Sequence, residues 1–457
     1  MNTELRKQLE ELYGRQNFGI KMGLEVVLEL LDRIGRPHLS FAAIHVAGTN
    51  GKGSVCAIME SALRQTGART GTGLYTSPHL VRFNERIRVD GVEISDAELG
   101  ELFADMRPAI ERTDSDSGRK ATFFECATAI AFEHFRRKGV RIAVLETGMG
   151  GRLDATNVVE PAVSVITPIS IEHTRYLGPD MRSIAREKAG IIKKGRPVVT
   201  ADQPDEAFDE IRKAAAERGS LLVSATEKVS VARVSVDPDG QKVRLRSEER
   251  DYGMLHLALH GRHQLGNLAT AVAALEVFNS VVGRDVVTPD AVRAGAALTV
   301  WPARLQVLNR NPMVVLDGAH NPGGARTLAE AVKDFGIRGR VGLIIGMCED
   351  KDISGFCGAL ARVVRRAWAV PLRTERGLPP SAVARACRDA GWDATEASLD
   401  EAVAKGIEWA AAEGTALFMA GSLYLAGEVL EKWPKWGFGV AGKEPVSGLT
   451  SRTQESG

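Results

Sequence analysis

The chain has 457 residues, 44% of them hydrophobic, and its 59 basic and 58 acidic residues leave a net charge of +1. This length suits two domains, and so small a net charge provides no overall field to attract nucleic acid or an anionic membrane, which favours a small-molecule substrate. The five cysteines form no C-x-x-C pair, which argues against a zinc or redox site and suits free thiols in a reducing compartment. The N-terminus lacks an apolar run and the apolar stretches are strand-sized, so we expect a cytoplasmic protein without a signal peptide or membrane span.

Short apolar segments alternate with helical patterns along most of the chain, which is typical of a parallel sheet covered by helices. The segments are residues 44–46, 142–145, 163–166, 313–316 and 341–345. Proline disfavours helix continuation at Trp301-Pro302, and we place a domain boundary there. We therefore predict an α/β protein with a larger domain over residues 1–300, a smaller Rossmann-like α/β domain over 303–440, and a disordered tail over 441–457.

A glycine-rich segment, Gly48-Thr49-Asn50-Gly51-Lys52-Gly53-Ser54, follows the first strand-like segment. Its glycines let backbone N–H groups turn toward an anion, the helix that follows contributes its positive end, and Lys52 adds a cation. Ser54 can offer a hydroxyl to phosphate or Mg²⁺, but it stands two positions after the lysine, which is a variant of the common Walker spacing. We predict a nucleotide phosphate loop followed by a helix that ends near Gly67; the alternative is a glycine-rich turn with an exposed lysine.

The loop resembles the phosphate loop of the Mur ligase superfamily, whose members join a carboxylic acid to an amine through an acyl phosphate. Four further motifs resemble those of folylpolyglutamate synthase and dihydrofolate synthase, and they follow the family order: Thr76-Ser77-Pro78-His79-Leu80, Asn84-Glu85-Arg86-Ile87, the segment from Glu146 to Asn157, and Asp317-Gly318-Ala319-His320-Asn321-Pro322. The loop begins at residue 48, so we expect no UDP-sugar domain before it, which favours the folate enzymes over the cell-wall ligases. The first domain is then a Mur-ligase-type P-loop ATPase domain, and the second a glutamate ligase domain.

The resemblance implies two Mg²⁺ sites. Residues matching Ser77 and Glu146 hold the first ion, and Glu146 ends a strand-like segment, where open parallel sheets place ligand-binding groups. A residue matching His173 serves the second site, although a lone histidine is more often structural or exposed. The family commonly has aspartate before this histidine, whereas this chain has Glu172.

The resemblance also implies a carboxylated lysine at Lys188. Helical spacing puts Lys188 on the same face as Ile184, and burial lowers the pKa of a lysine, so that its neutral amine can take up CO₂. Without the family, a lysine that reaches the surface is the simpler reading. We predict catalytic roles for Lys52, Lys188 and His173.

For the nucleotide, the resemblance implies contacts from Asn267, Arg304, Asp317 and His320. Asp317 ends a strand-like segment and can accept a hydrogen bond from a ribose hydroxyl. The alternative for all four is helix capping or hydrogen bonding between domains. Because these residues flank the expected boundary, we expect a cleft that closes around the reaction and excludes water.

Two segments resemble dihydropteroate-binding segments of bifunctional family members: Thr122-Phe123-Phe124-Glu125 and Leu153-Asp154-Ala155. One phenylalanine can stack on the pterin and Asp154 can bond its amino group, although one of two adjacent phenylalanines is usually in the core. We therefore predict an ATP-dependent enzyme, a monomer, that adds L-glutamate both to dihydropteroate and to reduced folates. The alternatives are a monofunctional folylpolyglutamate synthase and, in another class, an ATP-driven switch or binding module.

Overall fold

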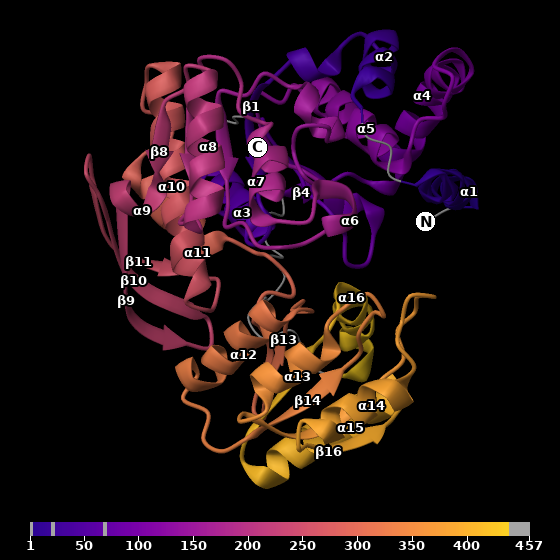
Figure 1. Ribbon diagram of the computed structural model, residues 1–457, viewed down its shortest axis with the longest axis vertical. Helices are drawn as coiled ribbons and strands as arrows, with labels where there is room; N and C mark the ends of the chain where they lie inside the picture. The colour runs from indigo at the N-terminus through magenta and orange to yellow at the C-terminus, as the bar shows by residue number, and fades with distance from the viewer. Residues whose placement is uncertain (1–2, 20–22, 67–70, 438–457) are drawn as a thin grey trace, which may run out of the picture. The chain divides into compact units, whose positions relative to one another are not determined.

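The computed structural model describes residues 3–19, 23–66 and 71–437 (Figure 1). The chain divides into two compact units, Met1–Arg304 and Leu305–Gly457, which we call unit 1 and unit 2. The tail over 441–457, expected to be disordered, and Gly67, expected to end a helix, lie outside the described residues.

Unit 1 is built on an eight-stranded sheet in the order β4-β3-β2-β5-β1-β6-β7-β8. The six strands from β2 to β8 in this order run parallel, and β3 and β4 extend one edge in antiparallel pairing. The strands are β1 Ala42–Ala47, β2 Thr72–Tyr75, β3 Ile87–Val89, β4 Val92–Glu93, β5 Ile142–Glu146, β6 Val163–Ile166, β7 Val198–Thr200 and β8 Leu222–Ser224. Since β2, β5 and β1 are parallel neighbours, the residues that follow them meet at one edge of the sheet.

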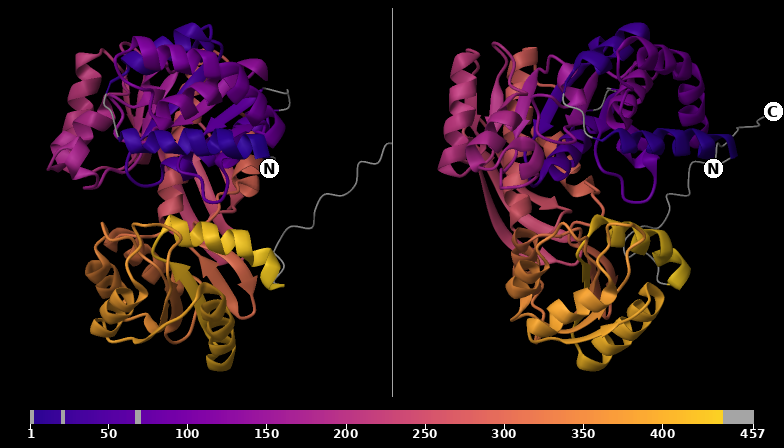
Figure 2. Two further views of the ribbon diagram at one scale, coloured as in Figure 1. Left: turned by 90° about the vertical axis from the view of Figure 1, so that its right-hand side faces the viewer. Right: turned by 45° about the vertical axis from the view of Figure 1, so that its right-hand side comes forward.

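Alternate residues of the central strands face two different cores, as the period of a strand requires. Ile44 and Val46 of β1 pack with α3, α10 and α11, whereas Ala43 and Leu145 pack with α1, α2, α4 and α5. Figures 1 and 2 show α1, α2, α4 and α5 gathered in one part of unit 1. The helices of unit 1 are α1 Thr3–Gly14, α2 Glu25–Arg33, α3 Lys52–Arg64, α4 Asp96–Asp116, α5 Phe123–Arg137, α6 Thr174–Leu177, α7 Met181–Ala189, α8 Asp205–Glu217, α9 Ala225–Lys228, α10 His263–Val282 and α11 Pro289–Leu298. Its 3₁₀ turns are η1 Arg15–Phe18, η2 Pro37–Leu39, η3 Phe83–Arg86 and η4 Ala155–Val158.

The helix α10 is apolar over a length that would cross a membrane, which corrects the expectation that apolar stretches are only strand-sized. Most of it is buried against α3, β6 and β7 in unit 1. Its composition is that of a core helix, with no polar face to present to water.

Unit 1 also carries a separate antiparallel sheet in the order β11-β10-β9, with strands β9 Val229–Asp237, β10 Gly240–Ser247 and β11 Asp251–Leu257. Burial alternates along β10, so that one face packs on the core with Val243 and Leu245 while the other faces solvent.

Unit 2 contains a six-stranded sheet in the order β12-β13-β17-β14-β15-β16, parallel except for the β12–β13 pair. The helices α12, α13 and α14 pack into one core with Leu343 and Phe418, and α15 covers the other face, where Trp409 contacts Trp368. The elements are β12 Gln306–Arg310, β13 Met313–Leu316, β14 Val341–Ile345, β15 Val364–Ala369, β16 Asp393–Glu396, β17 Ala416–Ala420, α12 Pro322–Asp334, α13 Ile353–Leu360, α14 Pro380–Asp389, α15 Leu399–Glu413, α16 Leu423–Lys432 and η5 Trp433–Trp436.

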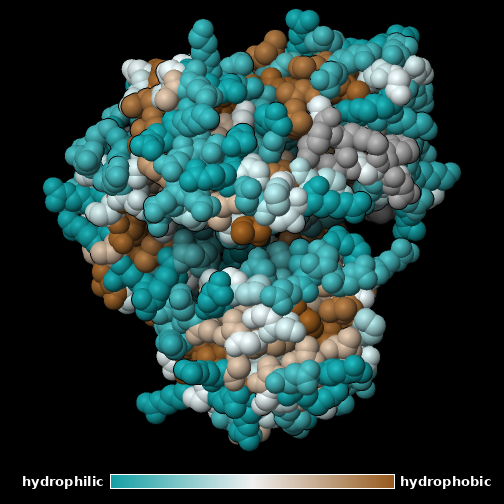
Figure 3. Space-filling model, viewed as in Figure 1, coloured by the Kyte–Doolittle hydropathy of each residue, from teal (hydrophilic) through white to brown (hydrophobic). Residues whose placement is uncertain are grey.

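All five strand-like segments of the sequence are strands, namely β1, β5, β6, β13 and β14. The face of the molecule in Figure 3 is mostly hydrophilic, with hydrophobic side chains in small groups. This fits the nearly balanced charge of the chain.

Candidate active site

The phosphate loop joins β1 to α3, and its glycines are required by close neighbours. Gly48 and Gly51 have φ values of 140° and 87°, in the region that side chains rarely adopt. A Cβ on Gly51 would lie 2.4 Å from Asn267 Oδ1, and one on Gly53 would lie 2.5 Å from the Trp301 ring. The loop is therefore enclosed by α10 and by the segment that follows α11.

The amides of the loop fall into two groups. Those of Thr49 and Asn50 donate to the carbonyl of Pro168 at 3.0 and 3.1 Å, so they do not face an anion, contrary to the simplest reading of the sequence. The amides from Gly51 to Ser54 have no hydrogen-bond partner within the described part of the chain, at the N-terminus of α3. These four amides form the anion cradle.

Lys52 and Ser54, both in the loop, differ in what their side chains can present to a ligand. Lys52 Nζ donates to the carbonyls of Gly48 and Thr49 at 3.1 and 3.2 Å, which holds its charge over the loop. Ser54 is 2% exposed and accepts from Gln264 Nε2 at 3.3 Å, so it is buried rather than presented to a ligand as its sequence position suggested. Gln264 in turn accepts from Asn267 Nδ2 at 2.8 Å, which fixes Asn267 against Gly51.

Glu146 and Ser77 meet at the ends of the neighbouring strands β5 and β2. Glu146 Oε2 accepts from the Ser77 amide at 3.0 Å. Burial raises the pKa of Glu146, while Lys52, the Ser77 amide and Arg304 act in the opposite direction. Glu146 thus shares one electrostatic environment with the phosphate loop.

These donors fit a magnesium ion. Neither Glu146 Oε1 nor the Ser77 hydroxyl has a partner within the described residues, and both are hard oxygen donors. Nowhere in the described residues do three His, Cys, Asp or Glu side chains gather as metal ligands. Mg²⁺ does not need such a cluster, because it usually keeps several waters and binds phosphate oxygens.

Lys188 lies inside unit 1, on the face of α7 that carries Ile184, and not at the surface, which was the simpler reading of the sequence alone. Its Nζ donates to the Gly48 carbonyl at 2.8 Å and to Glu172 Oε1 at 3.0 Å, and the residue is 1% exposed. Burial, with the charge of Lys52, lowers the pKa of Lys188 to about 8. The buried amine therefore lies directly beneath the phosphate loop.

His173 does not follow a strand directly, as the sequence suggested, but lies well past the end of β6 as the N-cap of α6, with φ 48°. It is exposed, whereas its neighbour Glu172 turns inward to Lys188. The second metal site is therefore not assembled from His173 and Lys188 as they stand, and we derive no step through it.

The first pterin segment has a structural role at two of its four residues. Thr122 and Glu125 form a capping box at the start of α5, and Glu125 also pairs with Arg119 at 2.7 Å. Phe123 is buried and stacks on Tyr13 at 5.6 Å, so it is the core member of the pair. Phe124 stays half-buried and packs on Gly148, which leaves it as the ring available for stacking.

In the second pterin segment, Asp154 is committed to its own loop. Its Oδ2 accepts from the amides of Gly148 and Met149, both at 2.9 Å, and its Oδ1 from the amide and hydroxyl of Thr156. The carboxylate thus bonds its own loop, and a bond from Asp154 to the amino group of a pterin stays a prediction. Leu153 is half-buried and Ala155 is buried beside it.

A buried histidine lies behind Asp154. Because the Thr156 hydroxyl donates to Asp154 at 2.5 Å, His45 Nε2 must donate to that hydroxyl, at 2.8 Å. Burial lowers the pKa of His45 to about 3, so the ring is neutral and anchors the loop through Thr156.

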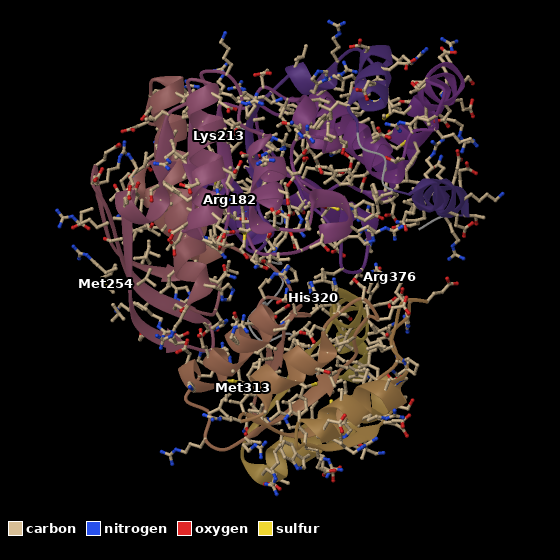
Figure 4. All side chains as sticks on the ribbon, viewed as in Figure 1. Arg182, Lys213, Met254, Met313, His320 and Arg376 are labelled. Carbon is tan, nitrogen blue, oxygen red and sulfur yellow. The ribbon has the colours of Figure 1, made fainter. Side chains whose placement is uncertain are left out.

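Arg304 and two residues of unit 2 complete the predicted nucleotide contacts. Arg304 is partly exposed at the end of unit 1, and its charge acts on Glu146 and His263. Asp317 accepts from the amides of Leu305 and Ala319, both at 2.7 Å, so its carboxylate is bound to backbone rather than directed only at a ribose. His320, labelled in Figure 4, contacts the Gly318 carbonyl through Nδ1 at 2.8 Å and precedes α12.

Sequence reasoning missed Gln264 and Trp301, which enclose the loop. Neither residue belongs to a local motif. Both lie far from the loop in sequence, and only the packing of α10 and of the segment after α11 brings them to it. Both stand in segments that the sequence marked for other reasons, Gln264 before Asn267 and Trp301 at the expected domain boundary.

Two family models match the chain: the Mur ligase middle domain over residues 46–275, and the Mur ligase, glutamate ligase domain over residues 303–423. The phosphate loop, Glu146 and Lys188 lie within the first match. Fold and site thus define a Mur ligase, a class of ATP-dependent ligases.

Similar proteins indicate which family of Mur ligases the chain belongs to. The chain is 39% identical over 341 residues to "Dihydrofolate synthase/folylpolyglutamate synthase" of Bacillus subtilis, covering 74% of this chain and 79% of that protein. It is 34% identical to the protein of the same name from Escherichia coli, covering 93% of each. The chain therefore belongs to the dihydrofolate synthase/folylpolyglutamate synthase family.

Solved structures of related proteins are similar to this chain. Folylpolyglutamate synthase of Mycobacterium tuberculosis complexed with ADP has a TM-score of 0.85 at 32% identity, covering 94% of this chain and 98% of that chain. E. coli FolC in complex with DHPP and ADP has a TM-score of 0.80 at 32% identity, with the same coverage.

Proposed function

We propose that the chain is an ATP-dependent ligase that adds L-glutamate to dihydropteroate and to reduced folates. The observation that carries this proposal is one edge of the unit 1 sheet, where the open amides of the loop, Lys52 and the Glu146–Ser77 pair occur together. The E. coli relative, which is matched over 93% of this chain, is named for both activities.

In the proposed reaction, the acceptor carboxylate attacks the γ-phosphate of ATP, ADP leaves, and an acyl phosphate forms. The amides from Gly51 to Ser54 and Lys52 hold the phosphates and stabilise the charge that develops on them. The amine of glutamate then attacks the acyl carbon, phosphate leaves, and an amide bond results. Lys52 uses two of its three N–H groups on the carbonyls of Gly48 and Thr49, which leaves one for a phosphate oxygen.

The residues that would hold Mg²⁺ are Ser77 and Glu146. Bound there, the ion would neutralise part of the charge of the phosphates. Asn267, Arg304, Asp317 and His320 remain our candidates for contacts to the nucleotide, with Asn267 supported by its position against Gly51.

Lys188 is our candidate for carboxylation, in which the neutral amine adds CO₂ and releases a proton. Its lowered pKa favours the neutral form, but the product would be an anion next to Glu172. A cation bound next to this pair would reduce the repulsion. The test is a ¹³C NMR spectrum with labelled bicarbonate: a carbamate signal is expected, and Lys188→Arg serves as the control that lacks it.

For the pterin we propose Phe124 as the stacking ring, near Leu153 and Ala155. The deciding assay offers dihydropteroate and tetrahydrofolate separately, each with ATP and radiolabelled glutamate. Label incorporated with both supports the bifunctional enzyme, and label with tetrahydrofolate alone indicates a monofunctional folylpolyglutamate synthase. ADP release that is equally fast without either acceptor would instead indicate an ATP-driven switch. We further propose a monomer that acts in the cytoplasm.

A further inference from the structure

One motif of the sequence has no role in the reaction so far: Asn84-Glu85-Arg86-Ile87, at the end of η3. Arg86 is 6% exposed, which is rare for an arginine unless a carboxylate pairs with it. Its one hydrogen bond from the side chain runs from Nε to His79 Nδ1 at 2.7 Å.

No carboxylate within the described part of unit 1 lies within 4.0 Å of the Arg86 guanidinium. The nearest in sequence, Glu85, accepts instead from the amides of Leu80, Val81 and Arg82. The undescribed internal segments, residues 20–22 and 67–70, contain no Asp or Glu. A largely buried guanidinium whose terminal nitrogens have no carboxylate partner is well suited to pair with an anionic ligand.

The guanidinium is held in one orientation. Its Cζ lies 5.1 Å from the centre of the Phe123 ring and 5.8 Å from that of Phe83. Since Nδ1 of His79 accepts from Arg86, the His79 Nε2–H is directed to the Tyr13 hydroxyl at 3.4 Å. The two terminal nitrogens keep contact with solvent and have no acceptor among the described residues. The two terminal nitrogens therefore form a fixed pair of donors that one carboxylate can accept from.

Hydrogen bonds of the backbone connect Arg86 to the residues of the candidate active site. Its backbone carbonyl accepts from the Thr76 amide at 3.0 Å, and the next residue, Ser77, donates to Glu146. Arg86 also acts electrostatically on Glu146, as Lys52 does. An acceptor carboxylate must approach a triphosphate of the same sign, and a second cation besides Lys52 reduces that repulsion.

We propose that Arg86 binds the carboxylate of the acceptor, the group that ATP activates, through its terminal nitrogens. The assignment rests on the proposed function, because it takes the acceptor to be a pterin acid. It makes Arg86 the residue that distinguishes an acid from a neutral analogue, whereas the rings of Phe123, Phe83 and Tyr13 orient the guanidinium.

The test is equilibrium binding, without ATP, of dihydropteroate and of its carboxamide analogue, which differs only at the carboxylate. The wild-type protein is expected to prefer the acid by about 10- to 100-fold, the range for hydrogen bonds to a charged group. In Arg86→Gln the preference disappears while affinity for the carboxamide stays within about threefold, because only the charge-assisted fork is lost. Arg86→Lys, which keeps the charge and loses the fork, is expected to retain part of the preference.

Arg88→Gln is the matched control, since Arg88 stands two residues away and already has Glu93 as a partner at 3.3 Å. It is expected to keep the wild-type preference. The assignment is overturned if Arg86→Gln still prefers the acid, or if it loses affinity for both ligands equally, which would mean a purely structural role. If the wild-type protein binds neither ligand, the proposed function itself fails.

Discussion

The two units are built alike, each with a mainly parallel sheet between helices, yet they differ in what they bury. Among the described residues of unit 2, only Asp317 and Ser422 are buried polar side chains, and both bond backbone amides. Unit 1 buries Arg86, Glu146 and Lys188 beside one edge of its sheet. The comparison teaches that the same architecture serves as an apolar framework in one unit and as a site for charged chemistry in the other.

If unit 2 is an apolar framework, its stability should depend on packing. Phe418 on β17 is 2% exposed in the core of unit 2, so Phe418→Ala is expected to lower the free energy of unfolding by about 3–5 kcal/mol. Urea denaturation followed by circular dichroism measures this, with Phe418→Leu as the milder control. A loss below about 1 kcal/mol would contradict a tightly packed core.

If unit 1 carries the chemistry, removal of one charge should affect the rate more than the fold. Lys52→Ala is expected to lower kcat by about 10²–10³-fold, the usual cost of losing one group that stabilises developing charge, with unfolding unchanged. Initial rates of ADP release measure the effect. Lys213→Ala is the control, an exposed lysine on α8 that Figure 4 labels. Equal rates in the two variants would remove Lys52 from the mechanism.

Asp317 tests whether unit 2 also takes part. Asp317→Asn keeps the shape but leaves one acceptor oxygen for two amides, so a loss of about 1–3 kcal/mol of stability is expected. Thermal unfolding checks this against Asp389→Asn, an exposed aspartate of α14. A rise in KM for ATP at unchanged stability would instead support the direct nucleotide contact that the sequence predicted.

The smallest expected effect is a loss of stability at acidic pH. His45 has a folded pKa of about 3, below its unfolded value, so the unfolded chain binds a proton first and stability falls as the pH drops below about 6.5. At pH 5.5 this linkage costs about 1.4 kcal/mol relative to pH 7.5. His45→Gln, which retains a donor for Thr156, should lose less stability over this range. Parallel losses in both proteins would show that His45 does not contribute.

The strands and the phosphate loop were predictable from the sequence because apolar segments and glycines act locally. The burial of Lys188 was indicated by the family resemblance and allowed by its spacing from Ile184, whereas the sequence alone favoured a lysine at the surface. The amide partners of Asp154 and Asp317 were not predictable: each residue stands where a ligand-binding carboxylate is expected, and backbone amides donate to it as well. Which acceptor a carboxylate serves depends on loop geometry that spacing does not encode.

Ser54, Gln264 and Arg86 illustrate a second limit. The burial of Ser54 follows from α10, which begins 209 residues later and closes over the loop. The missing partner of Arg86 is visible only when every nearby carboxylate has been assigned. Such properties belong to the packed molecule, and no single motif carries them.

Trp301 gives the loop an optical property. It is the single tryptophan of unit 1, since the other five stand in unit 2, and its indole lies against Gly53 at the start of α3. Its emission depends on the polarity and motion of its surroundings, so occupation of the neighbouring amides by phosphate should change the intrinsic fluorescence of the chain. The protein thus contains its own reporter of nucleotide binding, and a titration with ADP needs no label.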